Sequence, residues 1–384
     1  MKATVDQGYM LQTVRSAAKV APAKPTMEVL ASVRLRAADG RLWVEATDLD
    51  VTLIDCIDAV VDYWGAVCVS AKVLGQVLAK MPAGPLSLRF EGERLTVAAE
   101  GGPTVAINAE GDGAYPELPT MPDGGLTIDA DGLSALLGAV RHAVSTDESR
   151  PNLNGVFLRH GDDLRAVATD GHRLAQCSLP AVEGEPFDGC ILPFKGVDRL
   201  LEHATGGDLR LAFDVGTLGV ALPTGALLFI RLIDAAFPDY RQVIPKALPE
   251  PVVIKADELT RALGVVGTLA SERTHGVRLD FGAGEAGQVE ASSDNPDLGK
   301  ACAHIAHEGD APTDDGKPTV IACNVAYLLQ AVRALDCDTV ALHISGGLAP
   351  IALKPASKGA LDALHVIMPM RHSPPPPPSQ DLRR

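Results

Sequence analysis

The residues with the clearest chemical potential lie in one short segment, Thr169-Asp170-Gly171-His172-Arg173. A carboxylate two residues before a histidine could ligate a metal ion or act as a general base, as in a hydrolase. The sequence holds ten histidines, yet none forms an H-x-x-x-H or H-E-x-x-H pattern. Its seven cysteines are scattered without a C-x-x-C pair, which indicates reduced core thiols. We therefore expect no metal, no cofactor and no catalytic residue, and a hydrolase using Asp170 and His172 is the weaker alternative.

Composition indicates a folded, soluble protein that we expect in the cytoplasm. The 384 residues include 34 Lys and Arg against 49 Asp and Glu, for a formal net charge of −15. No apolar run reaches the roughly 18 residues that a membrane span needs, and the first residues do not form a signal peptide. The acidity argues against simple electrostatic adhesion to nucleic acid. With 37 Gly, 28 Pro and only 4% aromatic residues, the chain suits many short strands.

An internal repeat organises the chain. Strand-like Val-x-Leu segments contain Val33, Val156 and Val277, which are 123 and 121 residues apart. Each leads through a turn to an Asp, and Asp48, Asp170 and Asp294 are 122 and 124 residues apart. Hairpins of this kind recur in any β protein, but the shared phase favours tandem homologous domains. We predict domains over 1–122, 123–248 and 249–371, followed by a Pro-rich tail over 372–384. Because Asp48 and Asp294 have no histidine two residues on, a structural turn is the better interpretation of Asp170.

Each repeat should be an α+β domain with two helices and mostly antiparallel sheet. Apolar residues at helical spacing predict helices over 9–20, 131–145 and 256–270, and second helices over 71–81, 194–204 and 324–335. Alternating apolar residues predict strands between them. For an acidic chain, these helices carry few acidic residues and a set of basic ones: Arg15, Lys19, Lys72, Lys80, Arg141, Lys195, Arg199, Arg261 and Arg333. Basic residues solvate many helix faces, but a surface shared by all these helices would be positive.

The most specific motifs resemble a known family. The string Thr169 to Ala175, the segment Phe237-Pro238-Asp239-Tyr240 and the near-terminal Val366-Ile367-Met368-Pro369-Met370-Arg371 are similar to the bacterial DNA polymerase III beta subunits, the sliding clamps. Lys24-Pro25-Thr26, Thr47-Asp48-Leu49 and Asn324-Val325-Ala326-Tyr327 fit the same family. The resemblance covers residues 1–371 and requires the threefold repeat.

The resemblance implies a processivity factor without catalysis of its own. Two chains would join head to tail into a closed ring of six domains, with helices lining a hole that holds duplex DNA by topology. The implied partners are the DNA polymerase III alpha subunit, the clamp loader, and the clamp-binding peptides of repair polymerases and ligase-type proteins. A specialised clamp paralogue, for example one that tolerates an inhibitor of the main clamp, stays open as an alternative.

By the same resemblance, partner peptides would bind in a cleft between the second and third domains. Apolar residues there would hold a Leu or Phe of the peptide, and Met would adapt to different ligands. The implied residues are Leu153, Thr169, Gly171, His172, Arg173, Leu174, Pro238, Val243, Asn324, Tyr327, Val366, Ile367, Met368, Pro369, Met370 and Arg371. The alternative interpretation makes Val366 to Met368 a buried terminal strand and Thr169 to Gly171 only a turn.

The other two implied surfaces are the DNA-facing surface and the dimer interface. Lys24 and the nine basic helix residues named above are the candidates for phosphate contact or water-mediated attraction, which carries no sequence information. Val105 and Ile107 of one chain could meet Thr268 and Leu269 of the other. Five consecutive prolines in the tail favour a stiff polyproline II segment, and the tail could screen the cleft because it begins beside Arg371.

Overall fold

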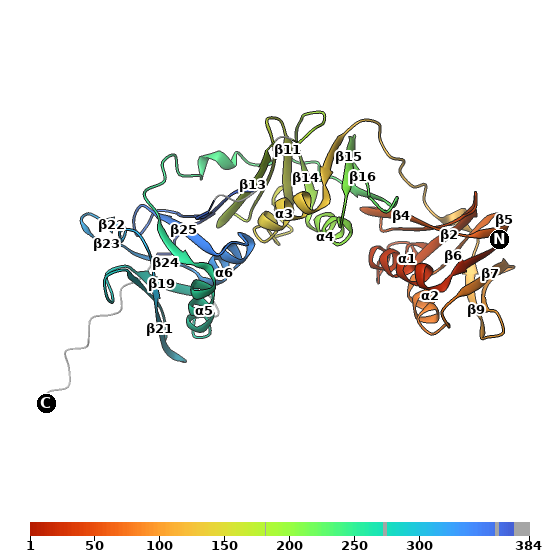
Figure 1. The fold of residues 1–384 in the computed structure, drawn as a ribbon, viewed down its shortest axis with the longest axis horizontal. Helices are drawn as coiled ribbons and strands as arrows, with labels where there is room; N and C mark the ends of the chain where they lie inside the picture. Colours follow the sequence, from red (N-terminus) through yellow and green to blue (C-terminus); the bar gives the residue numbers. More distant parts are fainter. Residues whose placement is uncertain (181, 272–274, 358–360, 372–384) are drawn as a thin grey trace. The chain divides into compact units, whose positions relative to one another are not determined.

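The computed structural model describes residues 1–180, 182–271, 275–357 and 361–371. Within them, no helix is long and apolar enough to cross a membrane. The predicted tail, 372–384, lies outside the described residues. The same order of elements, a strand, a helix, four or more strands, a second helix and three strands, occurs three times along the chain (Figure 1). The predicted α+β class is confirmed.

The first repeat begins with a capped helix. The Asp6 carboxylate accepts hydrogen bonds from the backbone N–H of Gly8 (2.8 Å) and Tyr9 (3.3 Å), which satisfies two free donors of the first turn. Its elements are β1 (Lys2–Asp6), α1 (Gln7–Val20), β2 (Ser32–Ala38), β3 (Arg41–Thr47), β4 (Val51–Asp58), β5 (Val60–Tyr63), β6 (Gly65–Ser70), α2 (Ala71–Leu78), β7 (Pro85–Glu91), β8 (Arg94–Ala99) and β9 (Thr104–Glu110). Helices α1 and α2 pack side by side (Figure 1).

The second and third repeats follow the same order. The second contains β10 (Leu126–Asp129), α3 (Ala130–Arg141), β11 (Gly155–His160), β12 (Asp163–Thr169), β13 (Arg173–Pro180), β14 (Phe187–Pro193), α4 (Phe194–His203), β15 (Asp208–Asp214), β16 (Thr217–Ala221) and β17 (Leu227–Arg231). The third contains β18 (Val252–Lys255), α5 (Ala256–Gly267), β19 (Gly276–Asp280), β20 (Gln288–Asn295), β21 (Gly299–Ala306), β22 (Thr313–Asp314), β23 (Lys317–Pro318), β24 (Val320–Asn324), α6 (Val325–Ala334), β25 (Thr339–Ile344), β26 (Ile351–Pro355) and β27 (Asp362–Ile367).

The helices lie where the periodicity predicted them, but several end earlier. Helix α2 stops at Leu78, and Pro82 soon after explains why the chain does not continue as a helix. Helix α3 stops at Arg141, and α5 stops at Gly267, followed by a turn in which the N–H of Thr268 donates to the carbonyl of Val265 (3.2 Å).

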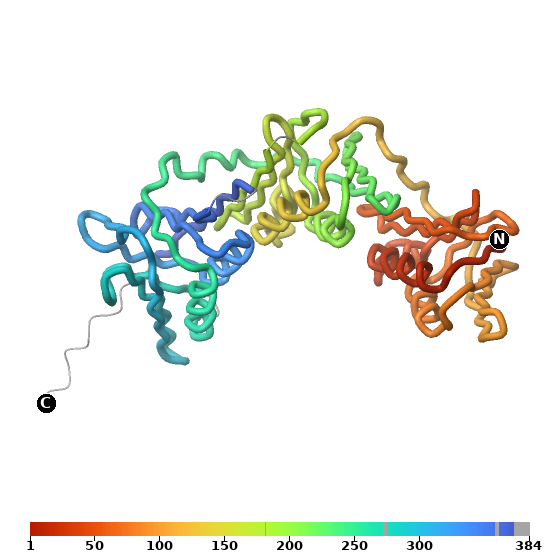
Figure 2. The backbone as a smooth tube through the Cα atoms, in the orientation of Figure 1, coloured from red at the N-terminus to blue at the C-terminus, as the bar shows by residue number. Residues whose placement is uncertain are grey.

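The sheets join different repeats. Over the described residues, a 13-stranded sheet combines the strands of the first repeat with β10, β15, β16 and β17, because β17 pairs with β4. An eight-stranded sheet combines β11 to β14 with β18 and β25 to β27, because β13 pairs with β27. In Figure 2 the blue tube of β27 runs beside the yellow-green tube of β13, although they are far apart in sequence. The chain thus forms two compact units, and the middle repeat contributes to both.

Each core is filled mainly by Leu, Val, Ile and Ala, as the composition predicted. Strand β2 shows the usual alternation of buried and half-exposed residues of a sheet with one face in the core. All seven cysteines are free thiols. Cys68, Cys177 and Cys323 are buried, and burial raises the pKa of each of these thiols to about 12. They pack as small apolar side chains.

Candidate functional site

The pairing of β13 with β27 brings the predicted peptide-binding residues of two repeats together. Arg173 lies opposite Ile367, and Leu174 lies opposite Val366. Beyond β27, the N–H of Met368 donates to the carbonyl of His172 (2.9 Å), and the N–H of Met370 donates to that of Ala322 on β24 (2.7 Å). The turn 169–173, the segment 368–371 and the first turns of α6 therefore meet. We call these three segments the junction surface.

The turn 169–173 is built by its own side chains. Thr169 Oγ1 donates to the carbonyl of Arg173 (2.6 Å), and Asp170 Oδ1 accepts from the N–H of His172 (2.8 Å) and of Arg173 (3.0 Å). Gly171 has φ +91°, a conformation that L side chains rarely adopt. Asp48 forms the equivalent turn in the first repeat, where it accepts from the N–H of Val51 (2.7 Å). Asp170 is therefore a turn-forming residue, and the described residues contain no group of three His, Cys, Asp or Glu side chains able to hold a metal ion.

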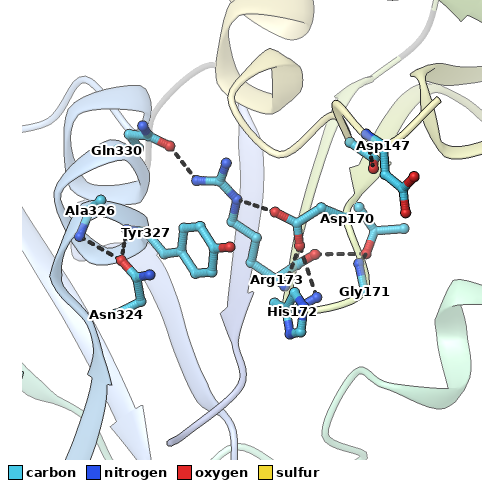
Figure 3. Close-up of polar contacts among 11 residues, drawn as sticks. Asp147, Asp170, Gly171, His172, Arg173, Asn324, Ala326, Tyr327 and Gln330 are labelled. Atoms are coloured by element: carbon cyan, nitrogen blue, oxygen red, sulfur yellow. Dashed lines mark hydrogen bonds and ion pairs between the residues drawn. The ribbon is translucent and has the colours of Figure 1, made fainter. Parts of the chain in front are cut away.

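Arg173 connects this turn to helix α6. Its Nε donates to Asp170 Oδ2 (3.0 Å), its Nη1 donates to Gln330 Oε1, and its guanidinium carbon lies 4.3 Å from the centre of the Tyr327 ring (Figure 3). Only 10% of the Arg173 side chain is exposed. The sequence did not identify Gln330, although Gln330 lies three residues after Tyr327 and therefore on the same face of α6.

Asn324 and Tyr327 take their positions from the start of α6. Asn324 Oδ1 caps the helix by accepting from the N–H of Ala326 (2.9 Å) and Tyr327 (3.3 Å), as Figure 3 shows, so its amide nitrogen is the group left for a ligand. Burial raises the pKa of the Tyr327 hydroxyl, the Asp170 carboxylate adds to this rise, and the Arg173 cation opposes it. The hydroxyl is therefore a neutral hydrogen-bonding group at pH 7.

The apolar residues of the predicted cleft fall into an exposed set and a buried set. Met368 is 43% exposed, Val243 is 46% exposed, and Pro238 is also exposed. Leu153, Leu174, Val366 and Ile367 are at most 7% exposed. A ligand can touch the first set directly, whereas the second forms the layer beneath, as the terminal-strand interpretation of Val366 and Ile367 indicated. Leu174 and Val366 belong to a core cluster with Tyr240, against which Phe237 and Ile244 pack.

Two histidines of the same unit, the half-buried His142 and the buried His365, lie side by side. The rings of His142 and His365 are 4.9 Å apart, and His365 is 1% exposed. Burial lowers the pKa of His142 to about 2, with further lowering by His365 and Arg173. Burial lowers the pKa of His365 to about 4. Both rings are therefore neutral at physiological pH.

The predicted DNA-facing residues differ in how free their charges are. Lys24, Arg15, Lys72, Lys80 and Arg333 are exposed and form no ion pair among the described residues. Lys195 instead pairs with the nearly buried Asp48, and Arg199 with Glu202 (2.6 Å), which Lys19 also approaches (3.6 Å). Arg261 pairs with Asp257 (3.4 Å). Arg141 ends helix α3 and is half-buried.

The predicted dimer residues lie on or near β9 and β21, two strands that are partly or wholly unpaired on one side in the described part of the chain. Val105 and Ile107 are on β9, which pairs with β8 along 104–108 but with β6 only at 109–110. The Ile107 side chain is 6% exposed, so it packs mainly inside its own chain. Thr268 and Leu269 follow the end of α5, which packs against β21. Strand β21 pairs only with β20 among the described strands.

Family profiles match nearly all of the chain. The N-terminal, central and C-terminal domains of the DNA polymerase III beta subunit match residues 1–119, 127–239 and 241–371. The chain belongs to the bacterial DNA polymerase III beta subunits. The beta sliding clamp of Caulobacter vibrioides is 31% identical and that of Escherichia coli 29% identical, each over 97% of this chain and the whole of the relative. The crystal structure of the beta subunit from Pseudomonas aeruginosa superposes with a TM-score of 0.88 at 26% identity, covering 97% of this chain and all of that one.

Membership of the beta subunits decides the class of function. These proteins are sliding clamps, which are processivity factors, so this chain is a replication clamp and not an enzyme. The hydrolase alternative built on Asp170 and His172 is therefore wrong, in agreement with the turn that Asp170 forms.

Proposed function

We propose that this clamp holds its protein partners through short peptides that bind the junction surface and the neighbouring Pro238 and Val243. The supporting observation is the meeting of the turn 169–173, the segment 368–371 and α6, where exposed apolar side chains lie beside a fixed guanidinium. Apolar anchors would supply most of the binding free energy, and polar groups would orient the peptide backbone. Met368 and Met370 can adjust to different apolar side chains because methionine is flexible and polarizable.

The proposed partners are the DNA polymerase III alpha subunit, the clamp loader, and the clamp-binding peptides of repair polymerases and ligase-type proteins. All would compete for one surface, so only one could occupy a given junction surface at a time. Bacterial chromosome replication takes place in the cytoplasm, and we propose that compartment for this chain.

For DNA, we propose a head-to-tail homodimer that closes around the duplex. Among the described strands, β9 has no partner on one side along residues 104–107, and β21 has none on one side. These edges can pair between two copies. Val105 lies on β9, Thr268 and Leu269 follow the helix that packs against β21, and Ile107 would support its strand from inside. The exposed Lys24, Arg15, Lys72, Lys80 and Arg333 are the first candidates for phosphate contact. Contacts to phosphates alone would let the ring slide.

The peptide proposal is tested by placing charge on the apolar part of the junction surface. A Met368→Asp and Met370→Asp double variant should weaken binding of a fluorescent peptide from the polymerase alpha subunit by at least about 100-fold, because buried unpaired carboxylates oppose an apolar anchor. Fluorescence anisotropy measures the affinity. Met27→Asp is the matched control, since Met27 is 46% exposed and lies in the other unit. Retained binding by the double variant would refute the assignment of the junction surface to peptide binding. Sedimentation velocity would show whether the double variant still forms the proposed dimer.

A further inference from the structure

We propose that Gln330, acting with Asp170, is a positioning residue for peptide binding. It fixes the guanidinium of Arg173 so that its remaining N–H groups receive an oxygen acceptor of the bound peptide. The inference rests on the proposed role of the junction surface in peptide binding. It adds a residue from the third repeat that controls how a side chain of the second repeat meets the ligand.

Three contacts on different sides determine the orientation of Arg173. Asp170 Oδ2 holds Nε at 3.0 Å, Gln330 Oε1 holds Nη1, and the Tyr327 ring lies 4.3 Å from the guanidinium carbon (Figure 3). Asp170 is itself fixed, because Oδ1 accepts two backbone N–H groups of the turn. If Asp170 were the only partner, the Arg173 guanidinium would be held to the turn 169–173 but could still shift relative to α6. The Gln330 contact removes that freedom, because it ties the group to the helix that carries Tyr327 and Asn324.

The free N–H donors of the Arg173 guanidinium determine what the bound peptide must supply. A guanidinium has five N–H donors, and Asp170 and Gln330 engage one each. For Nη2, no acceptor is found in the part of the chain that the structure describes. The side chain is nine-tenths buried, so covering it further with a peptide would leave these donors unsatisfied unless the peptide brings an acceptor. A carbonyl or carboxylate oxygen fits this requirement, and an apolar group does not.

The charge balance explains why a glutamine suits this position. Asp170 and Arg173 form a neutral pair, and Gln330 contributes an acceptor without charge. A neutral site can bind a backbone carbonyl and does not repel an acidic side chain. A glutamate at 330 would keep the contact but make the group of three net negative, which would disfavour acidic peptides.

The test compares Gln330→Ala, Gln330→Glu and the matched control Gln76→Ala in the full-length chain. Gln76 is exposed on α2 in the other unit and forms no hydrogen bond among the described residues. The probes are two fluorescent peptides built on a segment of the polymerase alpha subunit and matched in length, one with Asp or Glu and the other with Asn or Gln at the same positions. Gln330→Ala should weaken both peptides about tenfold, the effect expected for losing one hydrogen bond to a charged group. Gln330→Glu should stay within about twofold for the neutral peptide and lose affinity for the acidic one.

A double-mutant cycle separates positioning from a general structural effect. In an Arg173→Ala background, Gln330→Ala should cause no further loss, because the two residues act through one contact. An unchanged affinity for Gln330→Ala, or an equal loss in the Arg173→Ala background, would overturn the inference. If the unaltered protein binds neither peptide, the proposed function fails instead. Alanine is a better helix former than glutamine, so α6 should stay folded in the variant, and thermal unfolding checks this.

Discussion

The adjacent His142 and His365 should make the stability of their unit depend on pH. His365 lies on β27, opposite Ala175 of β13 and Leu353 of β26, with His142 beside its ring. The carbonyls of Ala331 on α6 and Ala139 on α3 oppose the lowering of the His365 pKa, and the Arg173 cation adds to that lowering. Replacing both rings with leucine removes the titration and keeps the position apolar.

The pKa values give the size and sign of the change in the free energy of unfolding with pH. An unfolded histidine titrates near 6.5, whereas folded His365 has a pKa of about 4, so the unfolded chain binds protons first. The free energy of unfolding therefore has its full value above about pH 6.5 and decreases as the pH drops towards 4. Each histidine contributes a slope of about 1.4 kcal/mol per pH unit, so His365 alone should lower the free energy of unfolding by about 2 kcal/mol between pH 6.5 and 5. The pKa of His142, about 2, extends the loss to lower pH.

Hydrogen exchange of the β27 amides at pH 7.5 and 5, corrected for intrinsic rates, measures this loss where it arises. The wild-type chain should lose protection at pH 5, and the His142→Leu and His365→Leu double variant should lose much less. His172→Leu, which removes an exposed histidine of the same unit, is the control and should behave like the wild type. An equal loss of protection in the double variant and the wild type would show that the buried pair does not cause the pH dependence.

Three further predictions concern the other surfaces. Val105→Asp should convert dimer to monomer in sedimentation velocity, because it places a charge on β9 beside the stretch that does not pair with β6. Val60→Asp on β5, the last strand of the same sheet, should leave the dimer intact. A stable Val105→Asp dimer would contradict the interface. An Arg15→Ala and Lys72→Ala double variant should reduce the slope of log K against log salt concentration, for binding to linear DNA, by about one per residue. Arg261→Ala, which removes a cation that already has an ion pair, should change the slope less. Equal slopes would show that the exposed basic residues without ion pairs do not contact phosphates. Deleting 372–384, which lies outside the described residues, should raise peptide affinity, and an unchanged affinity would exclude screening by the tail.

The repeat and the helices could be predicted because each follows from residue types and their spacing along the chain. The phase of Asp48, Asp170 and Asp294 follows from the spacing alone, and helix periodicity needs only near neighbours. The pairing of β17 with β4 and of β13 with β27 could not be predicted, since both pairs join distant segments by backbone contacts that leave no local pattern.

Candidate site residues were harder to predict where a partner is distant in sequence. Lys195 stays a predicted DNA-facing residue, and its ion pair with Asp48 of another repeat could not be predicted from the sequence. Gln330 could not be predicted as a site residue, because a single glutamine on a helix has no distinctive pattern and its proposed role depends on its contact with Arg173. Ile107 stays a predicted dimer residue, and the structure adds that strand alternation points its side chain into its own core.

The proposed function requires that the protein enclose DNA, which differs from binding it by charge alone. The direct measurement loads the clamp with its clamp loader onto nicked circular plasmid, raises the salt concentration, and then linearises the plasmid. A ring should stay on the circle in high salt and slide off once ends exist. Loss of the protein in high salt from the intact circle, with no effect of linearisation, would show electrostatic binding and contradict enclosure.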